Sequence, residues 1–283
     1  MELENSTQLV EGQEINQNEI FFISDIEHFS SKIKNYLLDR IKNNKFKAVV
    51  FVGDVLSGFS TEDPSYKIFK QSDTAFEMFY DVKKIMKKSA NKNIGEWNVA
   101  REYIGQVVSN ILLKKYAEEL KTFKSFVKAC YKTNIPVILF SGNHDSLLSH
   151  VNLYDERFIP VLNEIHSLRG LKIPEDFEVL KLKKDLYLMG IHTDEHTLET
   201  YQFPKIKDML ERLDKNIKNP EQIIFVSHVP GIKKFTNLGS PDISNFKKRF
   251  KFKYHYHGHC EDYYGEYDEE GVPTRSVNIN KDQ

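Results

Sequence analysis

Cysteine is scarce in this sequence: only Cys130 and Cys260 occur among 283 residues. Two cysteines so far apart argue against a disulfide framework and favour a reducing compartment. No apolar run approaches the ~20 residues that a transmembrane helix needs, so we expect no membrane span. The first 18 residues are polar and acidic, without the basic start and apolar centre of a signal peptide. We therefore expect a cytoplasmic protein.

The sequence also lacks an excess of charge of either sign. Its 40 basic and 41 acidic residues leave a formal net charge of -1, which excludes a global field that would steer the chain to nucleic acid or an anionic membrane. The glycine-rich phosphate loops of nucleotide kinases are absent as well. What remains, 40% hydrophobic and 29% charged residues, is typical of a soluble globular protein with a substantial core.

The chain divides into a tail and one domain. Residues 1–18 are expected to form a polar, disordered tail. Residues 19–283 contain no repeat or low-complexity linker, and we expect them to form one domain. Two helical patterns occupy about 57–134, where one helix is enough to cross back to a sheet. The other is predicted to be a helical insertion; a cap over the site, a homodimer surface and plain packing on the sheet flank all fit it.

Short apolar runs in this sequence end repeatedly in side chains that bind metals. Runs 19–24 and 48–52 lead to Asp25 and Asp54, with a helix expected from Ser30 or Ser31 between them. Strand, helix and strand in this order predict a right-handed parallel crossover, which places both aspartates at the carboxyl edge of one sheet. Four further runs (136–140, 186–191, 222–227 and 250–257) lead to Asn143, His144, Asp145, His192, His228, His259 and Glu261.

Taken together, five motifs resemble those of the calcineurin-like metallophosphoesterases. They are Asp25-Ile26-Glu27, Gly53-Asp54, Gly142-Asn143-His144-Asp145, His228-Val229-Pro230 and Gly258-His259-Cys260-Glu261. The resemblance implies an α/β fold, a sandwich of two mixed β-sheets flanked by helices, with two divalent metal ions at the strand ends. It assigns Asp25 to the first ion and makes Asp54 the bridge. It also assigns Asn143, His228 and His259 to the second ion, and makes His144, with Asp145 behind it, the group that contacts the phosphate or protonates the leaving group.

The implied chemistry is hydrolysis of a phosphoester bond by a metal-bound hydroxide. Two divalent ions roughly 3.5–4 Å apart clamp the phosphoryl oxygens and lower the pKa of water towards ~7. The unperturbed imidazole pKa of ~6.5 suits His144 for proton transfer at the other end of the reaction. Manganese is the expected metal, with magnesium, iron and zinc as alternatives.

Two positions depart from the family pattern, and both belong to the first ion. Glu27 and Glu261 stand where the family usually has histidine. We expect both to bind the first ion; the alternatives are that His28 or His257 substitutes by a register shift, or that this ion is absent. Ionised glutamates make the site more negative and favour hard ions such as manganese or magnesium. A phosphomonoester dianion suffers more from that charge than a diester monoanion, so we expect a tilt towards phosphodiesters.

The sequence thus predicts a metal-dependent phosphoesterase with a phosphoester substrate. Gly53-Asp54 continues as Val55-Leu56-Ser57-Gly58, which differs from the Gly-Asp-x-x-Asp-Arg-Gly block of the phosphoprotein phosphatase branch and argues against that branch. One alternative is a nuclease or cyclic-nucleotide phosphodiesterase on the same scaffold, with nucleic acid or a nucleotide as partner. The alternative outside enzymes is a non-catalytic protein-binding scaffold with a degenerate metal site.

Three further histidines follow or lie on predicted strands. We interpret His192 as part of a surface turn, with substrate contact as the alternative. His255 and His257 fall on one face of the run 250–257, together with Lys251 and Lys253. This face is expected to be solvated, or else to form a basic wall beside the metals.

Overall fold

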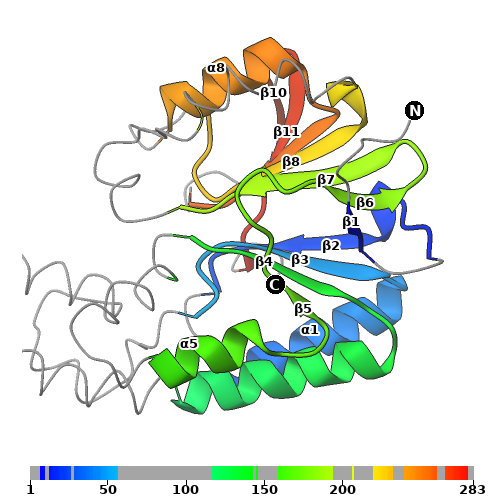
Figure 1. Ribbon diagram of the computed structural model, residues 1–283, viewed down its shortest axis with the longest axis vertical. Coiled ribbons are helices and arrows are strands. Elements are labelled where there is room, and N and C mark those ends of the chain that lie inside the picture. The colour runs from blue at the N-terminus through cyan, green and yellow to red at the C-terminus, as the bar shows by residue number, and fades with distance from the viewer. Residues whose placement is uncertain are drawn as a thin grey trace, which may run out of the picture.

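The computed structural model describes residues 7–9, 13–26, 29–56, 117–142, 145, 159–193, 206, 219–231, 239–259 and 265–279. Over these residues two β-sheets pack face to face, and helices cover their outer faces (Figure 1). The layers follow one another as helix, sheet, sheet and helix. The predicted fold class, a sandwich of two sheets flanked by helices, is confirmed. Both sheets were expected to be mixed, but the described strands of the smaller sheet are all parallel.

The smaller sheet has four parallel strands in the order β2–β3–β4–β5. β2 (Ile20–Ile23), β3 (Ala48–Val52) and β4 (Val137–Phe140) are buried at every position, as expected for parallel strands covered on both faces. β5 (Leu171–Lys172) forms one edge. The apolar runs therefore predicted β2, β3 and β4 to within one residue at each end.

The larger sheet has seven strands in the order β1–β6–β7–β8–β9–β11–β10. Its centre is parallel and consists of β7 (Leu186–Ile191), β8 (Ile223–Ser227), β9 (Tyr254–His257) and β11 (Val272–Ser276). β6 (Leu180–Lys183) and β10 (Gly265–Glu269) pair antiparallel with β7 and β11, and β1 (Thr7–Gln8) runs parallel to β6. This sheet is therefore mixed.

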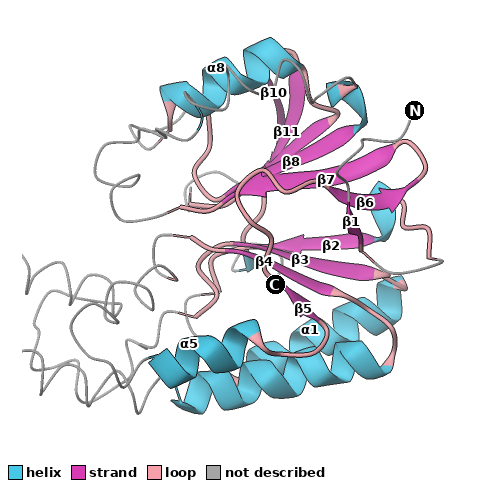
Figure 2. Cartoon of the chain, in the orientation of Figure 1, coloured by secondary structure: helices cyan, strands magenta, loops and turns pink. Residues whose placement is uncertain are grey.

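Helices cover both sheets from outside (Figure 2). α1 (Ser31–Asn44), a helix over residues 117–132 and α5 (Ile159–His166) lie on the smaller sheet, and α8 (Pro241–Phe250) lies on the larger one. Ser30 caps α1, because its Oγ accepts the N–H of Ile33 at 3.3 Å. Two 3-10 turns, η1 (Gln17–Glu19) and η4 (Pro220–Gln222), lead into β2 and β8.

Three apolar layers hold this arrangement together. Phe51 packs against Phe123 between the smaller sheet and its helices. The rings of Phe22 and Tyr256 stack between the two sheets, and Phe246 of α8 packs on the larger sheet. Burying one such side chain contributes about 1.5–3 kcal/mol. The contact between the sheets is thus a substantial part of the core, and it sets how the two carboxyl edges meet.

Over residues 7–9 and 13–18, the part of the predicted tail that the structure describes, the chain is ordered. Within residues 1–18, β1 pairs with β6, and Ile15 is fully buried between the sheets. A short strand and a single apolar anchor leave too weak a pattern to be recognised in a polar segment.

Two further expectations concern the middle and the end of the chain. The predicted strand 250–257 begins too early, because Phe250 is the last residue of α8 and Tyr254 the first of β9. Of the predicted insertion at about 57–134, residues 57–116 lie outside the described part of the chain, and residues 117–132 form a helix. Among the helices that the structure describes, none combines the length and apolarity needed to cross a membrane.

Candidate metal centre

Three candidate ligands that follow strands have a left-handed backbone. The φ angle is 56° at Asp25, 55° at Asp54 and 64° at His259. This conformation is uncommon for residues other than glycine and costs on the order of 1–3 kcal/mol per residue. It is held by bonds between the loops, since Ile26 N–H donates to Asp54 O at 2.8 Å and Asp25 N–H donates to Gly53 O at 3.2 Å. Backbone strain at three residues of one edge of the sandwich indicates a functional site there.

Gly142 and Gly258 leave the space that the two aspartates occupy. A Cβ on Gly142 would lie 2.2 Å from Asp54 Oδ1. A Cβ on Gly258 would lie 1.9 Å from Ser24 Oγ and 2.8 Å from Asp25 Oδ2. Both motifs need glycine because the backbone of one loop packs directly against the side chains of another.

His228 follows β8 in the larger sheet and reaches across to the smaller one. Its Nδ1–H donates to the carbonyl of Val52, the last residue of β3, at 2.8 Å. A bond of this kind fixes which nitrogen carries the proton and directs Nε2 towards a metal. Nε2 lies 3.0 Å from Asp54 Oδ2, but without hydrogen-bond geometry towards any described residue. The two atoms are therefore close enough for one ion to contact both.

Asp54, His228 and His259 together form a candidate set of metal ligands. One ligand atom from each lies within 4.8 Å of the others, and the imidazole rings of His228 and His259 are 5.1 Å apart. Asp25 adjoins this set, because its Oδ1 accepts the backbone N–H of His259 at 3.2 Å. Imidazole nitrogens suit zinc and iron, and a carboxylate extends the range to manganese. These donors fit a divalent ion.

The charges around His228 favour a cation at this place. Burial by itself lowers the pKa of His228, but the carboxylates of Asp54 and Asp25 outweigh it and raise the pKa to about 9. Asp25 and Asp54 are themselves buried, and buried carboxylates are costly unless they are paired or bind a metal. In the metal-free protein a proton on His228 supplies part of the positive charge that a metal ion would otherwise supply.

Asp145 links the loops that follow β3 and β4. Its Oδ1 accepts the N–H groups of Val55 and Leu56 at 2.8 and 2.7 Å, and its Oδ2 accepts the N–H of Gly142 at 3.0 Å. Burial and the negative charge of Asp54 raise the pKa of Asp145, while the three N–H groups oppose the rise. This function of Asp145 could not be predicted from the sequence, because the bonds to Val55 and Leu56 join residues about 90 positions apart.

His192 braces the two sheets instead of lying in a simple surface turn. Its Nε2–H donates to Pro174 O at 2.7 Å, so Nδ1 is the acceptor. Nδ1 lies 2.9 Å from both the backbone N and the Oγ of Ser141, which follows β4. Thr193 N–H donates to the carbonyl of the same serine at 3.0 Å. His192 and Thr193 thus join the carboxyl ends of β4 and β7.

The predictions for His255 and His257 are wrong in both forms. The two side chains are 0% and 1% exposed, so their face of β9 is not solvated. Burial also keeps the pKa of both well below the usual value, so they form no basic wall. β9 lies inside the larger sheet, between β8 and β11. Residues of α8 form part of the apolar layer that covers the outer face of this sheet.

The predicted site residues fall into two groups. The structure describes Asp25, Asp54, Asp145, His228 and His259, and it brings them to one edge of the sandwich. Glu27, Asn143, His144 and Glu261 lie outside the described residues. Their assignments, and with them the first ion, stay predictions.

A family model covers most of the chain: the sequence model of the calcineurin-like phosphoesterases matches residues 19–260. The chain belongs to this family. As a calcineurin-like phosphoesterase it is a metal-dependent hydrolase that acts on phosphoester bonds.

Matches to individual proteins add the fold alone. No curated protein matches the chain. One solved structure aligns over 90% of this chain and 88% of its own, with 12% identity and a TM-score of 0.51. A second, TT1561 of Thermus thermophilus, aligns over 91% and 87% with 9% identity and a TM-score of 0.48, and no argument rests on it.

Proposed function

We propose that this calcineurin-like phosphoesterase works with two divalent ions between the carboxyl edges of its sheets. The observation that carries the proposal is the convergence of Asp54, His228 and His259 within 4.8 Å. These residues and Asn143 would hold one ion, and Asp25, Glu27, Glu261 and Asp54 would hold the other. Bound ions supply Lewis acidity and make water nucleophilic near neutral pH.

Two side chains of the loop after β4 complete the proposed site. His144 contacts the phosphate or protonates the leaving group, for which an imidazole that titrates near neutral pH is suited. Asp145 supports it by joining that loop to the one after β3, through its bonds to Gly142, Val55 and Leu56.

The substrate preference that we propose for the enzyme depends on Glu27 and Glu261. Relative to two neutral histidines, two ionised glutamates make the site more negative by two charges. At ~4 Å and an effective dielectric of ~20, each unit changes the interaction with a phosphate by about 4 kcal/mol, an upper-end figure for so crowded a site. A phosphomonoester dianion is affected more than a diester monoanion. The enzyme is therefore proposed to favour phosphodiesters and, through its carboxylates, manganese or magnesium at the first position.

The experiment compares a nitrophenyl monoester with a matched diester. The chelated protein receives manganese, magnesium, iron(II) or zinc, and turnover is measured for the wild type and for a Glu27→His, Glu261→His double variant. We expect metal-dependent turnover in both proteins, with the ratio of monoesterase to diesterase activity higher in the double variant. The double variant should also lose its preference for manganese or magnesium.

Two results would contradict parts of the proposal. An unchanged ratio and metal preference would show that the glutamates do not set the charge at phosphorus. No turnover of any ester with any metal, with single-stranded DNA and a cyclic nucleotide included in the panel, would favour a binding scaffold over an enzyme.

A further inference from the structure

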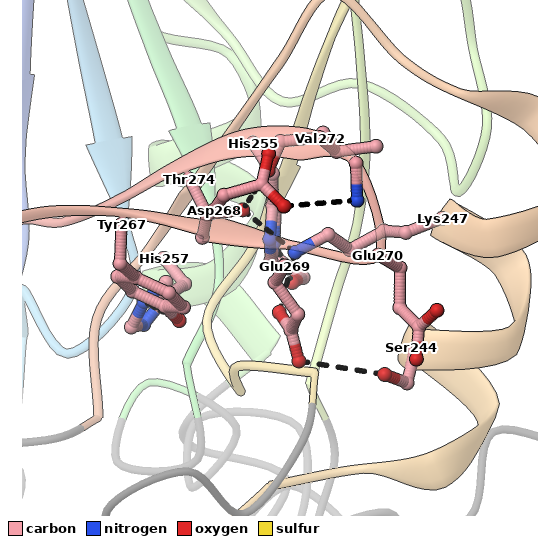
Figure 3. Close-up of polar contacts among 12 residues, drawn as sticks. Ser244, Lys247, His255, His257, Tyr267, Asp268, Glu269, Glu270, Val272 and Thr274 are labelled. Atoms are coloured by element: carbon pink, nitrogen blue, oxygen red, sulfur yellow. Dashed lines mark hydrogen bonds and ion pairs between the residues drawn. The ribbon is translucent and has the colours of Figure 1, made fainter.

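Behind the candidate ligands, β9 carries two buried histidines that the proposed reaction does not use. The Lys247 ammonium lies in the same region and donates to Glu269 and, at 2.7 Å, to Thr274 Oγ1 (Figure 3). Both rings are buried. Burial favours the neutral form of imidazole, which has a single N–H to place.

His257 connects a tyrosine of β10 to the peptide that precedes His259. Its Nδ1 lies 2.9 Å from the carbonyl oxygen of Gly258, which can only accept, so Nδ1 carries the proton. Nε2 is then an acceptor, and the hydroxyl of Tyr267 donates to it at 2.9 Å. The two side chains lie next to each other in the close-up (Figure 3). A chain of two hydrogen bonds thus runs from Tyr267 to the backbone that positions His259.

His255 makes a similar chain beside His228. The hydroxyl of Ser227 donates to the carbonyl of Val229 at 2.7 Å. Its one proton is used there, so the contact of 2.8 Å between Ser227 Oγ and His255 Nε2 has the imidazole N–H as donor. These bonds hold the residues on both sides of His228. Ser227 and His255 are completely buried, so water does not compete for them.

We propose that Tyr267, acting through His257, and His255, acting through Ser227, are positioning residues for the metal ligands His259 and His228. The inference rests on the proposed function, which makes these two imidazoles ligands of one ion. Apolar side chains of similar size would fill the same volume, but they would leave the two backbones without these bonds. Partners behind metal ligands typically affect metal affinity by ~10–100-fold.

The test measures metal affinity in matched pairs of variants of the full chain. Tyr267→Phe and Ser227→Ala each remove one hydroxyl from the chains of hydrogen bonds. Tyr256→Phe is the control for the first, because its hydroxyl accepts from Gln17 at 3.1 Å, away from the ligands. Ser276→Ala is the control for the second, because Ser276 Oγ is buried in the same sheet without a hydrogen-bond partner among the described residues. The probes are cobalt(II), followed by its visible absorption, and manganese(II), followed by calorimetry.

We expect the Kd for cobalt to rise about tenfold in Tyr267→Phe and in Ser227→Ala, and less than about twofold in both controls. Circular dichroism of the metal-free proteins checks that each is folded; if one test variant is not, the other decides, because it acts through a different histidine. Equal affinities in test variants and wild type would overturn the inference. So would equal losses in test variants and controls, which would reflect the stability of the sheet. A wild type that binds neither metal would instead contradict the proposed metal centre itself.

Discussion

The two sheets contribute different chemistry to the same site. The smaller sheet ends in carboxylates, Asp25 and Asp54, whose strained turns are cross-bonded to each other. The larger sheet leads to imidazoles, His228 and His259, with a layer of neutral histidines behind them. The smaller sheet therefore supplies negative charge. The larger sheet supplies imidazole nitrogens, whose orientation depends on hydrogen bonds.

Each sheet also positions a ligand that belongs to the other. Val52, at the end of β3, accepts from His228 Nδ1–H, and the backbone N–H of His259 donates to Asp25. The brace between His192 and Ser141 adds a third link across the same edge. The site consequently depends on the relative position of the two sheets. The stack of Phe22 on Tyr256 helps to hold that position.

The largest expected effects come from removing one ligand on each side. Asp54→Asn removes charge and His228→Ala removes a directed nitrogen, and each should lower bound metal and activity together by more than the ~100-fold of an outer-shell change. In the metal-free state the two should differ. His228→Ala removes the imidazolium whose pKa Asp54 and Asp25 raise, and loss of one buried charged partner should destabilise the fold by about 3–5 kcal/mol. Asp54→Asn removes only one of these two carboxylates and should cost less.

Metal analysis, steady-state kinetics and urea unfolding check this contrast. The control is His144→Asn, which should lower turnover by roughly 10²–10⁴ while metal content stays at the wild-type level. Normal metal stoichiometry in both ligand variants would show that the assignment of these positions is wrong. If Asp54→Asn and His228→Ala lowered the free energy of unfolding equally in the absence of metal, the proposed contrast would be wrong: the carboxylate would not act through its charge and the imidazole through its orientation.

The stability of the metal-free protein should depend on pH through His228. Its pKa is about 9 in the folded protein and ~6.5 when unfolded. Because the folded value is higher, the stabilisation is complete below pH ~6.5 and is lost as the pH rises through about 9. The difference corresponds to about 3 kcal/mol. Unfolding in urea with EDTA, at pH values from 6.5 to 9.5, should show this decrease.

Two controls separate His228 from other causes. The His228→Ala variant should lack the decrease. Saturating manganese or zinc should abolish it in the wild type, because a metal needs the neutral imidazole and binds more tightly as pH rises. A decrease of equal size in the variant would assign the effect to another group. His255 and His257, whose pKa values are lowered, act only towards acid pH.

The sequence predicted the strands and ligands that local pattern can encode. The apolar runs before Asp25, Asp54 and His228 are unbroken because both faces of those strands are covered, so strand and ligand appear side by side in the sequence. α8 was missed although Ser240 and Pro241 form a typical helix start. One of its lysines, Lys247, is buried in an ion pair, which a polar segment of sequence does not reveal.

Contacts between distant parts of the chain could not be predicted in the same way. Asp145 bonds to Val55 and Leu56 about 90 residues away, and the burial of His255 depends on α8 and β11, which no local periodicity reveals. Histidine and lysine on alternate positions of a strand look the same whether a helix covers them or water does. Only the packing of the layers decides between the two.

The smallest expected effect concerns the link within the smaller sheet. In Asp145→Asn the carbonyl oxygen keeps the bonds to Val55 and Leu56, but the amide cannot accept from Gly142, and a buried N–H left unpaired costs ~1–3 kcal/mol. The lost carboxylate charge, which burial and Asp54 disfavour, offsets part of this. We expect a net loss of about 1 kcal/mol in urea, with metal binding retained.

A double variant sharpens this expectation. In the Asp54→Asn background the charge of Asp145 is no longer disfavoured by its neighbour, so Asp145→Asn should cost more there than in the wild type. Equal costs in both backgrounds would show that the two carboxylates do not interact, and that Asp145 serves its loops through hydrogen bonds alone.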